Sequence, residues 1–322
     1  MVGGKKFCHN PSLLERLTAF IEQHKAGSPT DPNVYWISLR PRDIARLFRQ
    51  ESQAVVSHGM VKRLLKELGY RYRKQSKVLS TGSYEKRDQQ FLIIMNLILI
   101  MSLQTPVLSI DCKKKERLGN LYRAGKCYCT GVQKVFDHDY DYLAEGKVIP
   151  HGIYDLQANK GFISIGNSHE TARFIIDNLR WWWYEYGIHQ YPMAKNILIL
   201  CDSGGANSYR HHAFKLQLLE LATELGISII IAHYPPYSSK WNPIEHRLFC
   251  HVHAAISGKI FSDYQTVKEL IEHTCTDSGL SVVVRLNLKI YETKVKFDKS
   301  LMDTNRILHN PIIPELSYRI FP

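Results

Sequence analysis

Three acidic residues, Asp111, Asp202 and Glu245, are the side chains of this sequence best placed to do chemistry together. Asp111 ends the apolar segment TPVLSID, and Asp202 ends the apolar segment NILILCD. Glu245 opens a helical pattern after the apolar segment ISIIIAH and the stiff segment YPPYSSKWNP. In open α/β sheets, groups at the carboxyl ends of strands share a crevice. We therefore expect the three acids to meet at one edge of a sheet, although a single aspartate there is often only a turn residue.

Clustered carboxylates of this kind favour a metal-dependent reaction. Such groups repel one another and raise one another's pKa unless a cation neutralises them. Oxygen ligands with little Cys or His suit Mg²⁺, with Mn²⁺ as its substitute. Two ions, typically ~3.5–4 Å apart, clamp the attacking and leaving oxygens in phosphoryl transfer. One ion activates water or a 3′-hydroxyl and the other stabilises the departing 3′-oxygen, so cleavage and joining of DNA can share one site.

The residues near these acids also include candidates for contact with phosphate. Pro235, Pro236 and Pro243 stiffen the approach to Glu245, and Pro243 suits the first turn of a helix. The polar residues of this loop could contact phosphate oxygens, as an alternative to plain loop packing: Ser239, Lys240 and Asn242. A run of lysines after Asp111 favours contact with a DNA backbone over a solvated charge run: Lys113, Lys114 and Lys115.

The charge of the chain points to a polyanionic partner. The formal net charge is +12 and the isoelectric point is near 9.3 over 322 residues. Residues 1–105 hold 17 Lys and Arg against 8 Asp and Glu, so most of the excess lies in the first third. This balance favours nucleic acid over an anionic membrane surface. The seven cysteines are scattered and form no CxxC pair, so we expect a reducing compartment and a cytoplasmic protein, nucleoid-associated when bound to DNA.

The elements that must position these residues begin with three helical patterns, at about 12–25, 41–49 and 57–69, with a loop at 26–33. Ser57 is expected to cap the third helix and Gly69 to end it. A short turn joins the second and third helices, which predicts a helix-turn-helix. Its DNA-binding residues are expected to be the basic side chains in and after the third helix: Lys62, Arg63, Lys66, Arg71, Arg73 and Lys74.

The remainder of the sequence predicts an α/β catalytic domain. The apolar run at 91–101 is too short to span a bilayer and is expected to be a buried helix. Strand-like segments follow, including one that begins near 126, and then a helix from about 168 with Asn167 and Glu170 in capping-box register. Trp181, Trp182 and Trp183 are expected to pack in the core, with base stacking as the alternative. Three meandering strands followed by helix-strand-helix-strand-helix predict a ribonuclease-H-like mixed sheet.

This order of elements indicates the expected domains. They are a helix-turn-helix DNA-binding region at 1–75, a linker and helix at 76–104, the catalytic domain at 105–275, and an extension of unassigned role at 276–322. The fold class is thus α/β, with a small all-α region in front.

The segments around the three acids resemble a known family. HYPPYSSKWNPIEHRLF, at 233–249, resembles the signature around the third acid of mariner-like and insertion-sequence DDE transposases. SIDCKKKERLGN, HGIYDLQANKGFISIG and LILCDSGGANSYR resemble blocks of one bacterial branch of that group, whose catalytic domain is retroviral-integrase-like. The resemblance covers the chain from about residue 30 to its end. It identifies Asp111, Asp202 and Glu245 as the first, second and third acids.

This resemblance implies a transposase that cleaves DNA at the ends of a mobile element and joins it to target DNA. It also implies double-stranded DNA as partner, in the form of terminal inverted repeats and target, and a homodimer or larger assembly on that DNA. Two departures from mariner relatives fit the bacterial branch: SGGAN follows Asp202, and Glu245 lies 43 positions after Asp202, a longer spacing than is usual in mariner relatives. The sequence also looks shorter at its N-terminus than relatives with an additional helix-turn-helix, which would weaken recognition of the repeats.

Other functions stay open at this point. A non-catalytic helix-turn-helix regulator with a ligand-binding α/β domain would need none of the acids, and the chain could also be an inactive transposase remnant. A carboxylate-pair hydrolase, such as a glycosidase, would need neither the basic N-terminal region nor a third acid.

Overall fold

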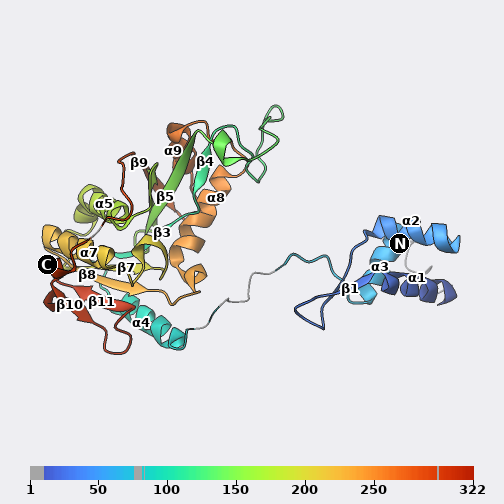
Figure 1. The fold of residues 1–322 in the computed structure, drawn as a ribbon, viewed down its shortest axis with the longest axis horizontal. Coiled ribbons are helices and arrows are strands. Elements are labelled where there is room, and N and C mark those ends of the chain that lie inside the picture. The colour runs from blue at the N-terminus through green and yellow to red at the C-terminus, as the bar shows by residue number, and fades with distance from the viewer. Residues whose placement is uncertain (1–10, 76–81, 83, 296) are drawn as a thin grey trace. The chain divides into compact units, whose positions relative to one another are not determined.

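The structure, a computed structural model, describes residues 11–75, 82, 84–295 and 297–322. Part of the predicted linker, at 76–81 and 83, lies outside these residues. The chain forms two compact units, Met1–Leu79 and Ser80–Pro322, which we call unit 1 and unit 2. Figure 1 shows the helices of unit 1 and the sheet of unit 2.

Unit 1 contains the three predicted helices, α1 (Pro11–Gln23), α2 (Pro41–Ser52) and α3 (His58–Glu67). Their apolar faces form one small core around Leu17, Phe20, Ile44, Phe48 and Leu64. As predicted, the side chain of Ser57 caps α3 by accepting a hydrogen bond from the Met60 amide at 3.2 Å. Gly69 follows the helix with φ +86°, a conformation that glycine adopts without strain.

The predicted loop between α1 and α2 is only partly a loop. Its two ends pair as the antiparallel strands β1 (Lys25–Gly27) and β2 (Tyr35–Ile37). The sequence signals the turn through Pro29, Asp31 and Pro32, but each flank has only three residues, too few for a visible alternation.

Unit 2 is built on one mixed sheet with the strand order β10-β11-β8-β7-β3-β5-β6-β9, and β4 pairs with β5 outside this path. In the centre, β3, β7 and β8 are parallel, whereas β5 is antiparallel to both β3 and β6. The strands are β3 (Val107–Cys112), β4 (Glu116–Leu118), β5 (Gly146–Asp155), β6 (Lys160–Gly166), β7 (Asn196–Cys201), β8 (Ser228–His233), β9 (Ser281–Asn287), β10 (Ile307–His309) and β11 (Ser317–Ile320). The mixed sheet expected from the sequence is confirmed.

Helices cover both faces of this sheet (Figure 1). On one face, α5 (Ala172–Trp182) and α7 (His212–Leu225) pack on β3, β7 and β8 in the largest core. On the other face, α4 (Arg87–Ile100) covers β7 and β8, while α8 (Cys250–Ile256) and α9 (Tyr264–Glu272) cover β5, β6 and β9. Shorter helical pieces are η2 (Asp141–Leu143), η3 (Trp183–Gly187), α6 (Ile188–Gln190), η4 (Gly205–Asn207), η5 (Ser239–Trp241), η6 (Glu245–Phe249), η7 (Lys299–Leu301) and η8 (Thr304–Arg306).

Three local predictions for unit 2 are wrong. Residues 126–140 form no strand, because this stretch runs over the surface with mostly exposed side chains. Helix α5 begins at Ala172, where the Thr171 side chain accepts a hydrogen bond from the Phe174 amide, so Asn167 and Glu170 form no capping box. Helix α4 is buried on one face only: Ile93 and Ile94 are buried, while Leu99 is 77% exposed.

Residues 276–322, to which the sequence assigned no role, lie at both ends of the sheet. β9 pairs in parallel with β6, and β11 pairs antiparallel with β8. These residues therefore complete the two sides of the sheet. No helix in the described part of the chain is long and apolar enough to cross a lipid bilayer.

The tryptophan cluster belongs to the core, as predicted. Trp182 is 1% exposed and packs edge-on against Phe162. Replacing Trp182 by alanine should lower the free energy of unfolding by about 3–5 kcal/mol, because a large aromatic side chain leaves a closely packed core. Urea unfolding followed by circular dichroism measures the change. Met193→Ala, at a side chain that is 72% exposed, is the control and should change stability by less than about 0.5 kcal/mol. Similar effects of the two variants would contradict the core assignment.

Candidate active site

Asp111 and Asp202 are brought together by the pairing of two parallel strands. The register of β3 with β7 sets Ile110 opposite Cys201, so the next residue on each strand is one of the two aspartates. Both lie on the sheet face that also carries Val107 and Leu200, since side chains alternate between the faces of a strand. The sequence prediction that these two acids share an edge of the sheet therefore agrees with the register.

The loop after β7 wraps around the carboxyl group of Asp202. The Gly204 backbone N–H and the Asn207 side chain donate hydrogen bonds to it. Its Oδ1 atom is nevertheless buried and has no hydrogen-bond partner among the described residues. A buried carboxylate oxygen without a donor is unfavourable, which makes Oδ1 a place where a further ligand would be stabilising.

The pKa values of both aspartates are raised. Burial, followed by the charge of Asp202, raises the pKa of Asp111 to about 8, and the neighbouring Glu245 carboxyl adds to this. Burial raises the pKa of Asp202 to about 6 against the hydrogen bonds from Gly204 and Asn207. The Cys112 amide donates a hydrogen bond of 2.7 Å to Asp111 Oδ1, which offsets only part of the rise. The cluster of Asp111, Asp202 and Glu245 thus lacks enough nearby positive charge to balance its carboxylates.

Glu245 is positioned by a clamp between its own segment and β3. The Asn242 side chain accepts a hydrogen bond from Ser109 Oγ, and its Nδ2 donates to the Ile110 carbonyl at 3.1 Å. The Ile244 amide donates to Ser109 Oγ at 3.0 Å. Glu245, the next residue, begins η6, which continues into α8.

A glycine on β5 allows this helix to lie close to the sheet. A Cβ added at Gly152 would meet Phe249 Cε1 at 2.6 Å and Ile244 Cδ1 at 2.8 Å. Gly152 pairs with Asp111 in the β3–β5 register, so the close approach happens beside the first acid. Sequence reasoning did not find Gly152, because nothing local distinguishes it from an ordinary strand glycine.

His233 supports Asp202 from behind. Its side chain is fully buried, and Nδ1 lies 3.0 Å from the Asp202 carbonyl oxygen, so Nδ1 carries the proton and donates. Burial lowers the pKa of His233 to about 4, which keeps the ring neutral. Tyr318 on β11 lies 3.4 Å from Nε2, and Gln90 on α4 donates to the His233 carbonyl at 2.8 Å. The residue is thus a strand-end histidine whose hydrogen-bonding groups are satisfied inside the fold.

A fourth acid, Glu170, lies beside this cluster and was missed as a site residue. Its charge raises the pKa of Asp202, and its carboxyl hydrogen-bonds with the half-buried Cys112 thiol. Lys115 Nζ lies 3.4 Å from Glu170 Oε2. The spacing of Glu170 in the sequence predicted only a capping role, and only the folded sheet reveals its neighbours.

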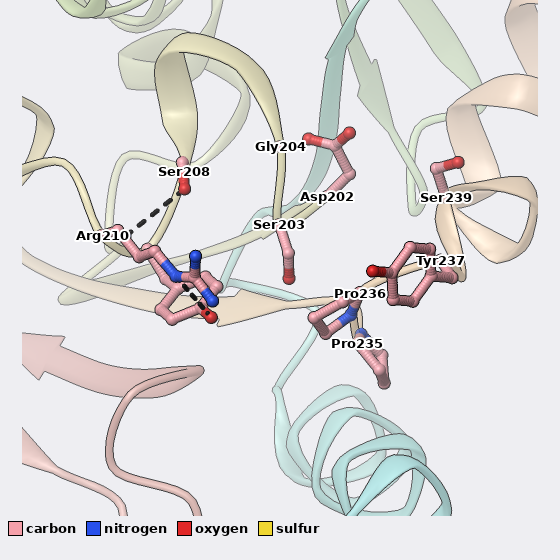
Figure 2. A pocket seen from close by; sticks show the side chains of 10 residues that line it. Asp202, Ser203, Gly204, Ser208, Arg210, Pro235, Pro236, Tyr237 and Ser239 are labelled. Atoms are coloured by element: carbon pink, nitrogen blue, oxygen red, sulfur yellow. Dashed lines mark hydrogen bonds between the residues drawn. The ribbon is translucent and has the colours of Figure 1, made fainter. Parts of the chain in front are cut away.

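A pocket of about 340 Å³ opens at Asp202, as Figure 2 shows. One wall is the loop with Ser203, Ser208 and Arg210, and the other holds Pro235, Pro236, Tyr237 and Ser239. Tyr237 is 61% exposed and has φ +65°. The proline loop predicted to stiffen the approach to Glu245 thus also forms a wall of the pocket next to Asp202.

The predicted DNA-contacting residues of unit 2 differ in their placement. Ser239 and Lys240 are exposed, and Ser239 lines the pocket at Asp202. Lys114 is exposed, whereas Lys113 is 10% exposed and pairs with Glu116 at 3.0 Å. Asn242 corrects the prediction: it is fully buried and its amide is bound to β3, so it positions Glu245 and cannot reach DNA.

The predicted DNA-binding residues of unit 1 are all exposed. Lys62, Arg63 and Lys66 lie on α3, and Arg71, Arg73 and Lys74 follow it. Arg71 donates hydrogen bonds to the Lys66 and Tyr70 carbonyls, which holds the chain against the end of α3.

The acid cluster fits a divalent cation in its chemistry. Its donors are carboxylate oxygens, its two aspartates have raised pKa values, and Asp202 Oδ1 is unpaired. Among the described residues, no three His, Cys, Asp or Glu side chains are arranged so that they could hold a metal ion together as they stand. The acids of the cluster therefore interact mainly through the repulsion of their charges, and a bound cation would relieve that repulsion.

These pKa values give a prediction for the metal-free protein. Its free energy of unfolding should fall as pH rises from about 4 to about 8, because folded Asp111 keeps a proton that the unfolded chain has released. Asp111→Asn should remove most of this fall and stabilise the protein near neutral pH by at least about 1.4 kcal/mol, the equivalent of one pKa unit. Urea unfolding in EDTA across this range measures both effects.

The matched control for this prediction is Asp263→Asn. Hydrogen bonds from the Thr266 amide and neighbouring hydroxyls lower the pKa of the exposed Asp263, so the same change there should not stabilise the protein. Equal stabilisation by both variants, or a flat pH profile of the unmodified protein, would contradict the raised pKa of Asp111.

Comparison with solved structures finds Mos1 transposase assemblies. The Mos1 transposase paired-end complex with left transposon end is 15% identical, with a TM-score of 0.45, and the match covers 84% of this chain and 73% of that one. A pre-cleavage Mos1 transpososome gives 15% identity, a TM-score of 0.46 and the same coverage. The mariner Mos1 paired end complex with Mg is 16% identical, with a TM-score of 0.46, and the match covers 83% of this chain and 73% of that one. No curated protein matches the chain.

Comparison with protein families finds one that spans almost the whole sequence. The family described as Rhodopirellula transposase DDE domain matches residues 16–322. This range holds most of unit 1 and all of unit 2, including the three acids and the strands β9 to β11. The chain therefore belongs to the Rhodopirellula transposase DDE domain family, and it is a DDE transposase, an enzyme of DNA transposition.

Proposed function

We propose that Asp111, Asp202 and Glu245 are the catalytic acids of this transposase and hold two divalent ions, Mg²⁺ or Mn²⁺. The observation that carries the proposal is the β3–β7 register, which sets two half-buried aspartates side by side with Glu245 against the first. The unpaired Asp202 Oδ1 supports it, since an oxygen left without a donor is available to a cation. The reaction is cleavage at the ends of the element, followed by transfer of the strand end into target DNA.

The protein's own residues prepare this site in three ways. The hydrogen bonds from Gly204 and Asn207 orient the Asp202 carboxyl group, and they leave its Oδ1 atom without a partner. The Ser109–Asn242 clamp holds Glu245 against Asp111. The pocket beside Asp202 gives the scissile phosphate a place next to the acids. When bound, the ions neutralise the carboxylates, polarise the phosphate and activate water or a 3′-hydroxyl.

We propose further that double-stranded DNA docks on unit 1. Helix α3 follows α2 after a short turn and exposes Lys62, Arg63 and Lys66. In helix-turn-helix proteins, the second helix enters the major groove and basic residues hold the phosphates. The Mos1 structures are paired-end complexes. For this chain, pairing of two DNA ends by a dimer or larger assembly is part of the proposal.

Each acid should be required for cleavage. Asp111→Asn, Asp202→Asn and Glu245→Gln should each lower the rate by more than about 100-fold, the upper range for residues that only support a metal site. The assay is cutting of a labelled duplex that carries the element's terminal repeat, with Mg²⁺ and then with Mn²⁺. Glu220→Gln, at an exposed carboxyl on α7, is the control and should cut at the normal rate. Normal cutting by Asp202→Asn would refute the assignment of the acids.

The basic face of α3 should set affinity for DNA and its salt dependence. Replacing Lys62, Arg63 and Lys66 by alanine should weaken binding and lower the slope of log affinity against log salt by about 1 for each phosphate that is no longer neutralised. Fluorescence anisotropy with the terminal-repeat duplex in EDTA measures both values. Lys25→Ala is the control, because Lys25, at the start of β1, is held by Glu22 of α1 at 3.0 Å. An unchanged slope in the triple variant would show that α3 does not contact the backbone.

A further inference from the structure

A second groove adjoins the acid cluster, on the side of α5 and α7. It has a volume of about 1070 Å³ and lies where the first turns of these two helices face the segment 289–295. The loop after Asp202 separates it from the pocket of Figure 2: Gly204 lines that pocket, whereas Gly205 lines the groove. Glu170 also lines the groove, so it reaches the neighbourhood of Asp202.

The wall formed by 289–295 is tied to the start of α5. Ser168 Oγ donates a hydrogen bond to the Lys289 carbonyl at 3.2 Å and accepts one from the Tyr291 amide at 3.1 Å. His169 Nδ1 lies 3.1 Å from the Tyr291 carbonyl, and Lys289 pairs with Asp177 on α5 at 2.7 Å. The groove is therefore a built feature of unit 2, because several bonds hold this wall to α5 and to the segment just before it.

The helix ends that face the groove favour an anion. Helix α5 has 11 residues and α7 has 14, and neither has an acidic residue in its first turn. No side chain caps α7. Helix N-termini carry unpaired N–H groups and a partial positive charge, and both attract phosphate.

The charged side chains that line the groove also favour an anion. The basic residues exceed the acidic residues Glu170 and Glu292 among the residues that line it: Lys115, Arg173, Lys289 and Lys294, with His211 beside them. Lys115 is held by Glu170, and Lys289 by Asp177. Arg173, in the first turn of α5, is exposed and has no ion pair among the described residues.

An independent observation points to a ligand in this groove. Gln217 on α7 lines it and is only 5% exposed, yet its Oε1 is buried without a hydrogen-bond partner. Within the described chain no hydrogen bond uses this amide, and an unused buried amide is costly. Glutamine amides are common donors to phosphate oxygens in DNA complexes, and a turned amide exchanges its N–H₂ and oxygen positions.

We infer that this groove binds the phosphodiester backbone of a DNA strand as it leaves the acid cluster on the α5 side. Arg173, the first turns of α5 and α7, and the Gln217 amide hold its phosphate oxygens. The inference rests on the proposed function, since it takes DNA as the substrate that reaches the acids. It assigns to unit 2 a DNA contact separate from the one proposed for α3.

The test measures DNA binding by unit 2 within the full chain. The starting protein carries Lys62→Ala, Arg63→Ala and Lys66→Ala, so that contacts by α3 are removed. The probe is a labelled duplex of mixed sequence, because phosphate contacts do not depend on sequence. Anisotropy is followed against NaCl in EDTA, where no cleavage occurs.

Two variants in this background have different expected effects. Arg173→Gln should weaken binding and lower the salt slope by about 1, because one phosphate is no longer neutralised. Gln217→Leu should weaken binding by about threefold to tenfold with the slope unchanged, because it removes a neutral hydrogen bond. Lys195→Gln, which removes one exposed charge at the opposite end of β7, is the control and should change neither value. Thermal unfolding checks that Gln217→Leu is folded, and Arg173 is exposed enough that its replacement should not disturb the fold.

The other outcomes overturn the inference in distinguishable ways. Equal losses of affinity in Arg173→Gln and Lys195→Gln would show that affinity depends on the net charge of the protein and not on binding in the groove. Unchanged binding in both groove variants, with DNA still bound, would refute the groove and leave the three acids and α3 untouched. No binding at all by the starting protein would show that unit 2 holds no DNA, whereas failure of the acids appears only in the cleavage assay.

Discussion

The parallel pairing of β3 with β7 is the constraint on which the rest of unit 2 depends. It leaves no freedom in where Asp111 and Asp202 go, because the register that buries Ile110 and Cys201 also places the next two residues side by side. Two carboxylates in that position repel, and burial strengthens the repulsion. Hydrogen-bond donors reach only some of the oxygens of these two carboxylates, and the pKa of Asp111 stays at about 8. Stability is thus given up at the position where we propose that a cation binds, as is common at functional sites.

The third acid depends on the same strand through the two-residue period of a β-strand. Ser109 and Asp111 point to the same face, about 7 Å apart along the strand. Ser109 binds the turn that precedes Glu245, so the anchor and the first acid move as one rigid piece. Gly152, opposite Asp111, leaves room for the helix that the anchor starts. One strand therefore fixes all three acids: two by register and one by a side-chain clamp.

Sequence reasoning found the acids because their signals are local. Asp202 follows a run of five apolar residues, and Glu245 follows a proline-rich segment. Both patterns can be recognised without knowing which residues lie next to them in the folded chain. It misassigned Asn242, Glu170 and the half-exposed helix α4 because their roles are set by contacts with distant segments. An asparagine in a polar loop predicts a surface contact, but Ser109, 133 residues away, takes up its amide. The apolar run of α4 predicts burial all round, but the sheet offers it only one face.

The C-terminal segment supports the backbone of Asp202, although it follows all three acids in the sequence. β11 pairs with β8 and brings Tyr318 to the ring of His233, whose other nitrogen holds the Asp202 carbonyl. Gln90 on α4 joins Ser317 to the His233 carbonyl from the other side. The backbone of the second acid is thus supported by residues that come both before β3 and after β9 in sequence. Of the strands after Glu245, β11 therefore helps to hold the Asp202 backbone in place, and it lies within the range that the family match covers.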